Sequence, residues 1–133
     1  MDIESIEKLY AGKFKGAKRM RVADVIELSN NTAVVVEGKM RRKKETLIRY
    51  GDSSVTSYNF ELKDIDGKGN DTDILIPCTN YQSYDLNPVI ALSEDGDILT
   101  MVGDYRAADS VLYISRIVNH KFLAKKPDFK PDV

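Results

Sequence analysis

The sequence predicts a mostly β protein of the α+β type, a small antiparallel barrel or sandwich with a short N-terminal helix. Runs rich in β-branched and aliphatic residues recur along the chain, and turn residues separate them about every ten residues. The clearest run, 55–65, alternates polar and apolar residues with a period of two. The 133 residues fit one β-rich domain over 1–124, OB-like or SH3-like in size, followed by an extended tail over 125–133.

The first element is a predicted helix over residues 2–11. Asp2 suits the N-cap and Gly12 suits the C′ position that follows a helix. One helical face is apolar and consists of Ile3, Ile6, Leu9 and Tyr10. Because an amphipathic helix buries its apolar face, we expect this helix to cover an open end of the sheet.

A β-hairpin is predicted next, with strands over Val22–Leu28 and Ala33–Glu37 and a turn at 29–32. Its register would place Arg21 opposite Met40 and Arg19 near Arg42, which brings two basic clusters to one end of the hairpin. Half of the 20 Lys and Arg residues would then meet there. These ten cations are Lys13, Lys15, Lys18, Arg19, Arg21, Lys39, Arg41, Arg42, Lys43 and Lys44. Such a density of like charge calls for acidic neighbours or an anionic partner.

A third strand over 45–50 and a turn over 51–54 lead into the alternating strand 55–65. Tyr50, Tyr58 and Phe60 on these strands could form a stacking platform, although aromatic rows in small barrels more often belong to the core. The acidic segment 64–73 contains clustered carboxylates around Gly67, but its spacing does not match a calcium-binding loop. We therefore expect a hairpin loop there and no metal site.

The second half predicts a short strand over Ile74–Pro77, a recognition loop over 79–88, and a second hairpin formed by Val89–Leu92 and Ile98–Val102. The Asp95-Gly96 pair marks its turn. Residues 111–118 fit either a strand or a helix face, and their β-branched content favours the strand.

Catalytic motifs are missing from the sequence, which has neither a glycine-rich phosphate loop nor a paired nucleophile and base. The single Cys78 and single His120 exclude the zinc spacings built from these residue types. We expect no enzyme activity and no cofactor.

Charge is distributed unevenly although the net charge is only −1. Residues 1–50 carry 12 basic and 7 acidic side chains, whereas residues 51–133 carry 8 and 14. Opposite patches of this kind allow a basic binding face or self-association into a homo-oligomer. The sequence shows no signal peptide and no membrane-spanning run, so we expect a cytoplasmic protein, or a virion component if it is a viral product.

Two functions follow as hypotheses. The first is a non-enzymatic protein that binds single-stranded DNA or RNA through the basic hairpin end, because cations interleaved with aromatic rings suit phosphates and stacked bases. Its candidate binding residues are Lys13, Phe14, Lys15, Lys18, Arg19, Arg21, Lys39, Arg41, Arg42, Lys43, Lys44 and Tyr50. The alternative is a viral or phage structural protein, or an interaction protein such as an inhibitor or assembly factor, whose basic patch meets an acidic protein surface.

Overall fold

One long, strongly bent strand, β2 (Thr32–Tyr50), organises the fold. In this computed structural model, which describes residues 17–81 and 83–123, β2 pairs with two different neighbours along its length. Its first part lies antiparallel to β5 (Ile98–Arg106), and its second part lies antiparallel to β3 (Ser53–Ile65). Gly38 lies at the change of partner, where a Cβ atom would stand only 2.5 Å from the carbonyl oxygen of Lys63. The bend therefore requires glycine.

The other strands close the sheet into a barrel. β3 pairs with β4 (Asp71–Thr79), and β5 pairs with β6 (Val111–Asn119). β6 then joins β4 through two parallel pairs, Cys78 with Leu112 and Thr79 with Tyr113. The strand order β2-β3-β4-β6-β5, with β5 returning to β2, is the Greek-key barrel of the OB fold. The expectation of a small, mostly β barrel is confirmed. The helix predicted over 2–11 and the tail over 125–133 lie outside the described residues.

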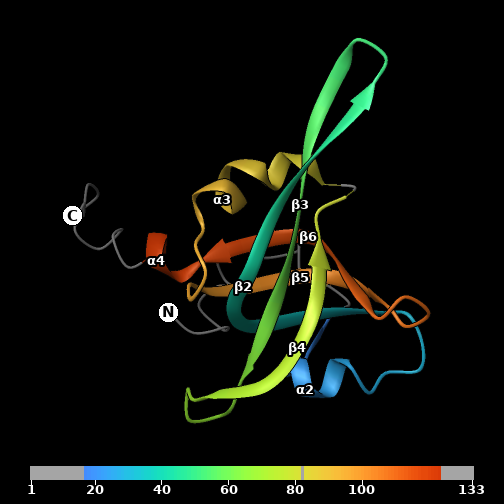
Figure 1. Ribbon diagram of the computed structural model, residues 1–133. Helices are drawn as coiled ribbons and strands as arrows, with labels where there is room; N and C mark the ends of the chain where they lie inside the picture. Colours follow the sequence, from blue (N-terminus) through green and yellow to red (C-terminus); the bar gives the residue numbers. More distant parts are fainter. Residues whose placement is uncertain (1–16, 82, 124–133) are drawn as a thin grey trace, which may run out of the picture.

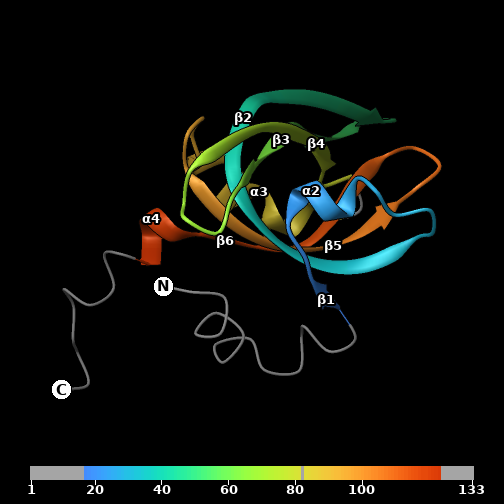
Figure 2. The ribbon, with the colours of Figure 1, turned by 90° about the horizontal axis from the view of Figure 1, so that it is seen from below.

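Short helices cover the two ends of the barrel. α2 (Val22–Val25) lies below the strands in Figure 1, and α3 (Asn87–Leu92) lies above them. Figure 2, turned to view the molecule from below, shows α2 in front of the opening of the ring of strands. Val22, Val25 and Ile90 are fully buried in the core that fills the barrel. A further short helix, α4 (His120–Leu123), follows β6. No helix in the described part of the chain is long and apolar enough to span a membrane.

The hairpin predicted from Val22 to Glu37 is wrong. Residues 22–25 form α2, preceded by the two-residue strand β1 (Lys18–Arg19), which runs parallel to β2 at Val34 and Val35. Val22 and Val25 have the i, i+3 spacing of a helix face, and burial of this face outweighs the β preference of valine. The predicted strands over 33–37 and 45–50 are parts of the single strand β2. The actual hairpin is β2–β3, with its turn at Gly51 and Asp52, and it projects past α3 in Figure 1.

The strand predicted over Val89–Leu92 is also wrong, because these residues belong to α3. Pro88 occupies the first turn of this helix, where a missing N–H is tolerated, and a four-residue apolar run does not by itself distinguish strand from helix. A short 3₁₀ helix, η1 (Tyr84–Leu86), precedes α3 inside the predicted loop. The turn at Gly96, with φ of 95°, does occur, but it links α3 to β5. The strand interpretation of residues 111–118 is confirmed by β6.

Candidate functional site

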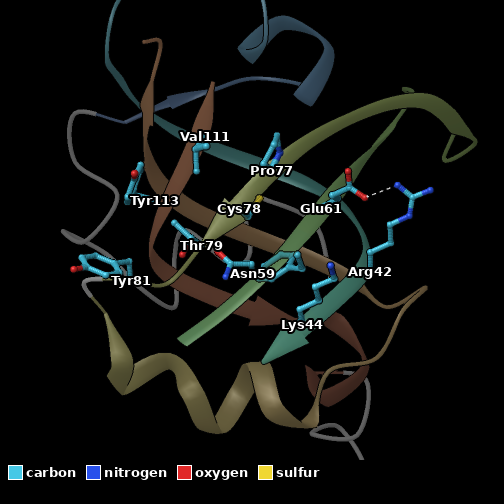
Figure 3. A pocket seen from close by; sticks show the side chains of 11 residues that line it. Arg42, Lys44, Asn59, Glu61, Pro77, Cys78, Thr79, Tyr81, Val111 and Tyr113 are labelled. Carbon is cyan, nitrogen blue, oxygen red and sulfur yellow. Dashed lines mark hydrogen bonds and ion pairs between the residues drawn. The ribbon is translucent and has the colours of Figure 1, made fainter. Parts of the chain in front are cut away.

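A groove of about 630 Å³ crosses the outer face of the barrel from β2 over β3 and β4 to the beginning of β6. Figure 3 shows its lining side chains: cationic groups at the β2 edge, polar groups along the floor and tyrosines at the far side. The cations are Arg42 and Lys44, the floor includes Asn59, Glu61, Pro77 and Thr79, and the tyrosines are Tyr81 and Tyr113. The groove therefore lies over the seam where only two residue pairs join β4 to β6.

A β-bulge in β2 determines which of its cations face the groove. The register of β2 against β3 shifts by one residue between Arg41 and Lys44, and Arg42 has the unusual φ of 54°. Regular alternation would place Arg42 and Lys44 on the same side as buried Met40. The extra residue instead places both side chains along the groove. A bulge re-aims side chains in this way, and a non-glycine residue in the left-handed region is held there at an energetic cost.

The same bulge turns Lys43 toward the barrel end under α3. Its Nζ donates hydrogen bonds to the carbonyl oxygens of Ile90 (3.1 Å), Ala91 (3.1 Å) and Ser93 (2.6 Å) at the end of α3. The last carbonyls of a helix lack a full set of helical partners, so an ammonium group there caps the helix. Of the three, the Ile90 carbonyl also accepts from the backbone N–H of Ser93 at 3.0 Å. The carboxylate of Asp95 accepts from the backbone N–H groups of Arg42 and Lys43, at 3.1 Å and 3.4 Å. Lys43 and Asp95 together hold the bulge in place.

The two groove cations differ in their surroundings. Arg42 donates from Nη1 to Oε1 of Glu61 at 3.2 Å, and 73% of its side chain is exposed. Lys44 is exposed and makes no ion pair with any described residue. Because solvent screens an exposed pair such as Arg42–Glu61, the guanidinium remains able to exchange its carboxylate for another anion.

Aromatic rings form the far side of the groove. Tyr81 is 49% exposed. The guanidinium of Arg106 lies over the ring of Tyr113, 4.0 Å from the ring centroid. The hydroxyl of Tyr113 donates to Asp109 at 3.5 Å. Tyr81 and Tyr84 contact each other edge to face, with centroids 6.4 Å apart. The groove thus offers planar π-faces opposite its cations.

A buried asparagine fixes the loop that carries these tyrosines. The Oδ1 of Asn80 accepts from the backbone N–H of Tyr58 at 2.7 Å, and its Nδ2 donates to Asn87. Asn87 in turn donates to the carbonyl oxygen of Thr56 at 2.8 Å. β4 ends at Thr79, so these two amides satisfy the backbone groups of β3 that would otherwise lose their partner strand. The loop is therefore anchored on β3 immediately before Tyr81.

The convergence of cations predicted from the sequence does not occur among the eight of the ten that the structure describes. Arg21 pairs with the buried Asp64 at 2.5 Å, and Lys39 pairs with Asp71 at 2.6 Å. The Lys39 ammonium lowers the pKa of the Asp71 carboxyl. The prediction failed because it assumed a strand over 22–28, whereas α2 directs Arg21 to the opposite end of the barrel from α3.

The remaining predicted residues lie in several places. Lys18 and Arg19 are exposed on β1, and Arg41 is exposed on β2 opposite Glu61. Tyr50 lies at the tip of the β2–β3 hairpin. Lys13, Phe14 and Lys15 lie outside the described residues. Of the nine candidates within the described residues, Arg42 and Lys44 are the two that line the groove.

Several groove residues were not among the sequence candidates: Asn59, Thr79, Tyr81 and Tyr113. Thr79 and Tyr81 belong to the predicted recognition loop over 79–88, so a signal for them existed. Asn59 lies on β3 and Tyr113 on β6, and the sequence alone could not show that these two strands lie near each other. Tyr58 and Phe60 are buried, which confirms the core interpretation for these two rings.

The described residues contain no group of three or more His, Cys, Asp or Glu side chains that could hold a metal ion. Cys78 is buried beneath the groove, and burial raises the pKa of its thiol, so a reactive thiolate is disfavoured. His120 is partly buried, and burial lowers its pKa. Its Nε2 lies 2.7 Å from the Thr100 hydroxyl.

No protein-family model and no curated protein matches this sequence. Solved structures similar to it include yeast Stn1 and Ten1, with a TM-score of 0.51, 16% identity, and coverage of 94% of this chain and 74% of that chain. A Klebsiella pneumoniae lipoprotein proposed to bind nucleic acid has a TM-score of 0.49 and 12% identity, covering 90% of this chain and 98% of that chain. The Stn1–Ten1 complex of S. pombe has a TM-score of 0.42 and 14% identity, covering 84% and 92%. At these identities the likeness to yeast Stn1 and Ten1 concerns the fold alone.

Proposed function

We propose that this protein binds single-stranded nucleic acid in the groove and does so without catalysing a reaction. The observation that carries the proposal is the β-bulge, which places Arg42 and Lys44 across the groove from Tyr81 and Tyr113. Cations along one side neutralise phosphates, and aromatic rings on the other side, of which Tyr81 is 49% exposed, stack with bases of any sequence.

The fold supports the same proposal. OB barrels bind oligonucleotides and oligosaccharides on the outer face of their second and third strands, which correspond here to β3 and β4. The groove lies on this face. A net charge of −1 gives the whole molecule no long-range attraction for polyanions. Binding therefore depends on the local arrangement of Arg42 and Lys44.

The test is a titration of fluorescent single-stranded DNA and RNA oligonucleotides against the full chain at several salt concentrations. Replacement of both Arg42 and Lys44 by alanine should weaken binding, and should reduce the slope of log affinity against log salt by about 1.4, because each lost phosphate contact contributes about 0.7. Arg49→Ala is the matched control, since it removes an exposed cation of β2 that does not line the groove. Equal losses in the double variant and the control would contradict the groove as the binding site, and absence of wild-type binding at low salt would contradict the function itself.

The alternative function, protein recognition, has one supporting observation. Leu47 and Leu92 are large apolar side chains that are more than half exposed. Exposed apolar side chains that gather into a patch mark protein contacts. Replacing both with serine should abolish binding of a protein partner and leave the nucleic-acid titration unchanged. Loss of oligonucleotide affinity in this variant would argue against a separate protein-binding surface.

A further inference from the structure

The outer edge of β2 beyond the bulge is not paired with another strand in the described part of the chain. β5 pairs with β2 as far as Lys39, and the Asp95 carboxylate accepts from the backbone N–H groups of Arg42 and Lys43. From residue 44 to residue 50, β2 pairs on one side only, with β3, and this part of the hairpin projects past α3 in Figure 1. A strand edge with unpaired N–H and C=O groups is a template for a further strand. We call residues 44–50 of β2 the free edge.

One face of the free edge carries opposite charges on either side of a leucine. Because alternate residues of a strand point to the same face, Glu45, Leu47 and Arg49 lie together on the face away from the groove, which Lys44 lines. Leu47 is 56% exposed. Glu45 and Arg49 are four residues apart, roughly 13 Å along the strand, which is too far for an ion pair between them. Arg49 lies opposite Ser54 of β3 and makes no ion pair with a described residue.

The free edge is complementary to a second copy of itself in one antiparallel register. With a two-fold axis at Leu47, each Glu45 lies opposite Arg49 of the other copy, and the two Leu47 side chains meet at the axis. If the axis moves by one residue, to Thr46 or to Ile48, both charge pairs are lost. The order of acidic, apolar and basic residues on this face therefore favours a single register.

We infer that two copies of this chain associate through the free edge, antiparallel and with the two-fold axis at Leu47, so that their hairpins form one continuous sheet. The inference does not depend on the proposed function. A second copy is the occupant that the charges favour, because the two-fold axis gives both Glu45 and Arg49 an opposite charge and sets one exposed leucine against another. The axis is perpendicular to the sheet, so both grooves lie on one face and the charge pairs lie on the other.

The interface is small. One pair of seven-residue strands lies below the size of a stable protein interface, and an exposed ion pair contributes little. We therefore expect an equilibrium between monomer and dimer at protein concentrations between about 1 µM and about 1 mM. Added salt should shift this equilibrium toward the monomer, because it screens the charge pairs.

Sedimentation velocity of the full chain over this concentration range, without nucleic acid, tests the inference. Arg49→Glu places two carboxylates opposite each other at both charge pairs and should weaken the dimer at least about tenfold, as should Glu45→Arg. The combined variant, Glu45→Arg with Arg49→Glu, restores opposite charges and should restore the dimer. Lys68→Glu is the matched control, because it makes the same change of charge in the exposed turn between β3 and β4. Thermal melts establish that each variant is folded.

A cross-linking experiment tests the register. Leu47→Cys places two thiols opposite each other at the axis, so a mild oxidant should produce a covalent dimer. Asp52→Cys on the same hairpin is the control, because in this register residue 52 lies opposite residue 42 of the other copy and not opposite itself. The native Cys78 is buried and should not contribute.

Several results would overturn the inference. If wild type is monomeric over the whole range, a second copy does not occupy the free edge. If the dimer forms equally well in Arg49→Glu, the copies meet elsewhere. If the combined variant is folded but monomeric, or if Asp52→Cys cross-links as readily as Leu47→Cys, the register is wrong. None of these measurements involves nucleic acid, so their failure is distinct from failure of the proposed function.

Discussion

Lys43 and Lys44 are neighbours of identical chemistry, yet they belong to two regions of the molecule that use positive charge differently. Lys43 caps the end of α3 and holds the barrel end together. Lys44 lies along the groove and makes no ion pair among the described residues. Arg21 at the α2 end resembles Lys43, because it also serves the fold through the buried Asp64. The comparison shows that a cation is available for a ligand where the fold supplies no acceptor, as at Lys44, or only an exposed one, as at Arg42.

The largest effect should come from the structural region, at Asp64. Its carboxylate accepts from the side chain of Arg21, from the backbone N–H of Ala23 at 3.2 Å and from the hydroxyl of Thr72 at 3.1 Å. Asp64→Ala leaves these donors without their acceptor, and we expect the free energy of unfolding to fall by about 2–3 kcal/mol. The Arg21–Asp64 ion pair contributes only part of this free energy, because the Arg21 side chain is partly exposed and solvent screens the pair. Chemical denaturation measures the change.

The exposed Asp24 on α2, next to Ala23, provides the control for this prediction. Asp24→Ala should change the free energy of unfolding by less than about 0.5 kcal/mol. If both variants lose the same stability, Asp64 is not the acceptor that fixes α2 on the barrel.

The adjacent lysines provide the most direct test of the comparison. Lys43→Ala should lower the free energy of unfolding by about 1–2 kcal/mol, because three carbonyls at the end of α3 lose an ammonium donor. Groove affinity should change little, because Asp95 still accepts from the backbone N–H groups of residues 42 and 43 and so keeps the bulge. Lys44→Ala should leave stability within about 0.5 kcal/mol and reduce the salt slope of oligonucleotide binding by about 0.7. Thermal melts and titrations on the same samples separate the two results. If Lys44→Ala instead lowered stability and Lys43→Ala reduced the salt slope, Lys44 would be the structural residue and Lys43 the ligand-binding one.

A smaller effect is expected inside the groove, at Glu61. This carboxylate pairs with Arg42 and repels phosphate. Glu61→Gln releases the guanidinium, so affinity for single strands should rise by about 2- to 5-fold, in line with the modest strength of an exposed ion pair. Asn59→Ala, also on the floor but uncharged, is the comparison variant. A decrease in affinity with Glu61→Gln would show that the carboxylate contacts the ligand directly.

The smallest effect concerns the contact between hairpin and loop. Tyr50→Phe removes the hydroxyl that bonds to Tyr84, so the Tyr84 pKa should fall from about 12 toward the ordinary value of 10. The raised pKa favours the folded contact below pH 10 and loses this contribution as pH rises toward 12. NMR titration of tyrosine Cζ signals measures the shift. An unchanged Tyr84 titration in Tyr50→Phe would mean that the two hydroxyls do not interact in solution.

Much of the fold could be predicted from the sequence, because period-two alternation identified β3 and β-branched content identified β6. Residues 22–25 and 89–92 were misassigned because short apolar runs fit both helix and strand, and only packing against the barrel ends decides between them. The site was less predictable. The bulge at Arg42 depends on Asp95 and α3, which are distant in sequence, and no local pattern indicates that Lys43 points inward while Lys44 points outward.

The seam between β4 and β6, which lies beneath the groove, should be the place where the barrel opens locally. Two parallel residue pairs are a weak closure for a barrel, so the amides of Leu112 and Tyr113 should exchange with solvent through local opening more readily than those of the long β2–β3 ladder. A single-stranded nucleic acid in the groove that contacts Asn59 on one side of this seam and Tyr113 on the other links the two sides of the seam. Bound nucleic acid would then stabilise the pairing of β4 with β6. Part of its binding free energy would be measured as slower hydrogen exchange of the Leu112 and Tyr113 amides.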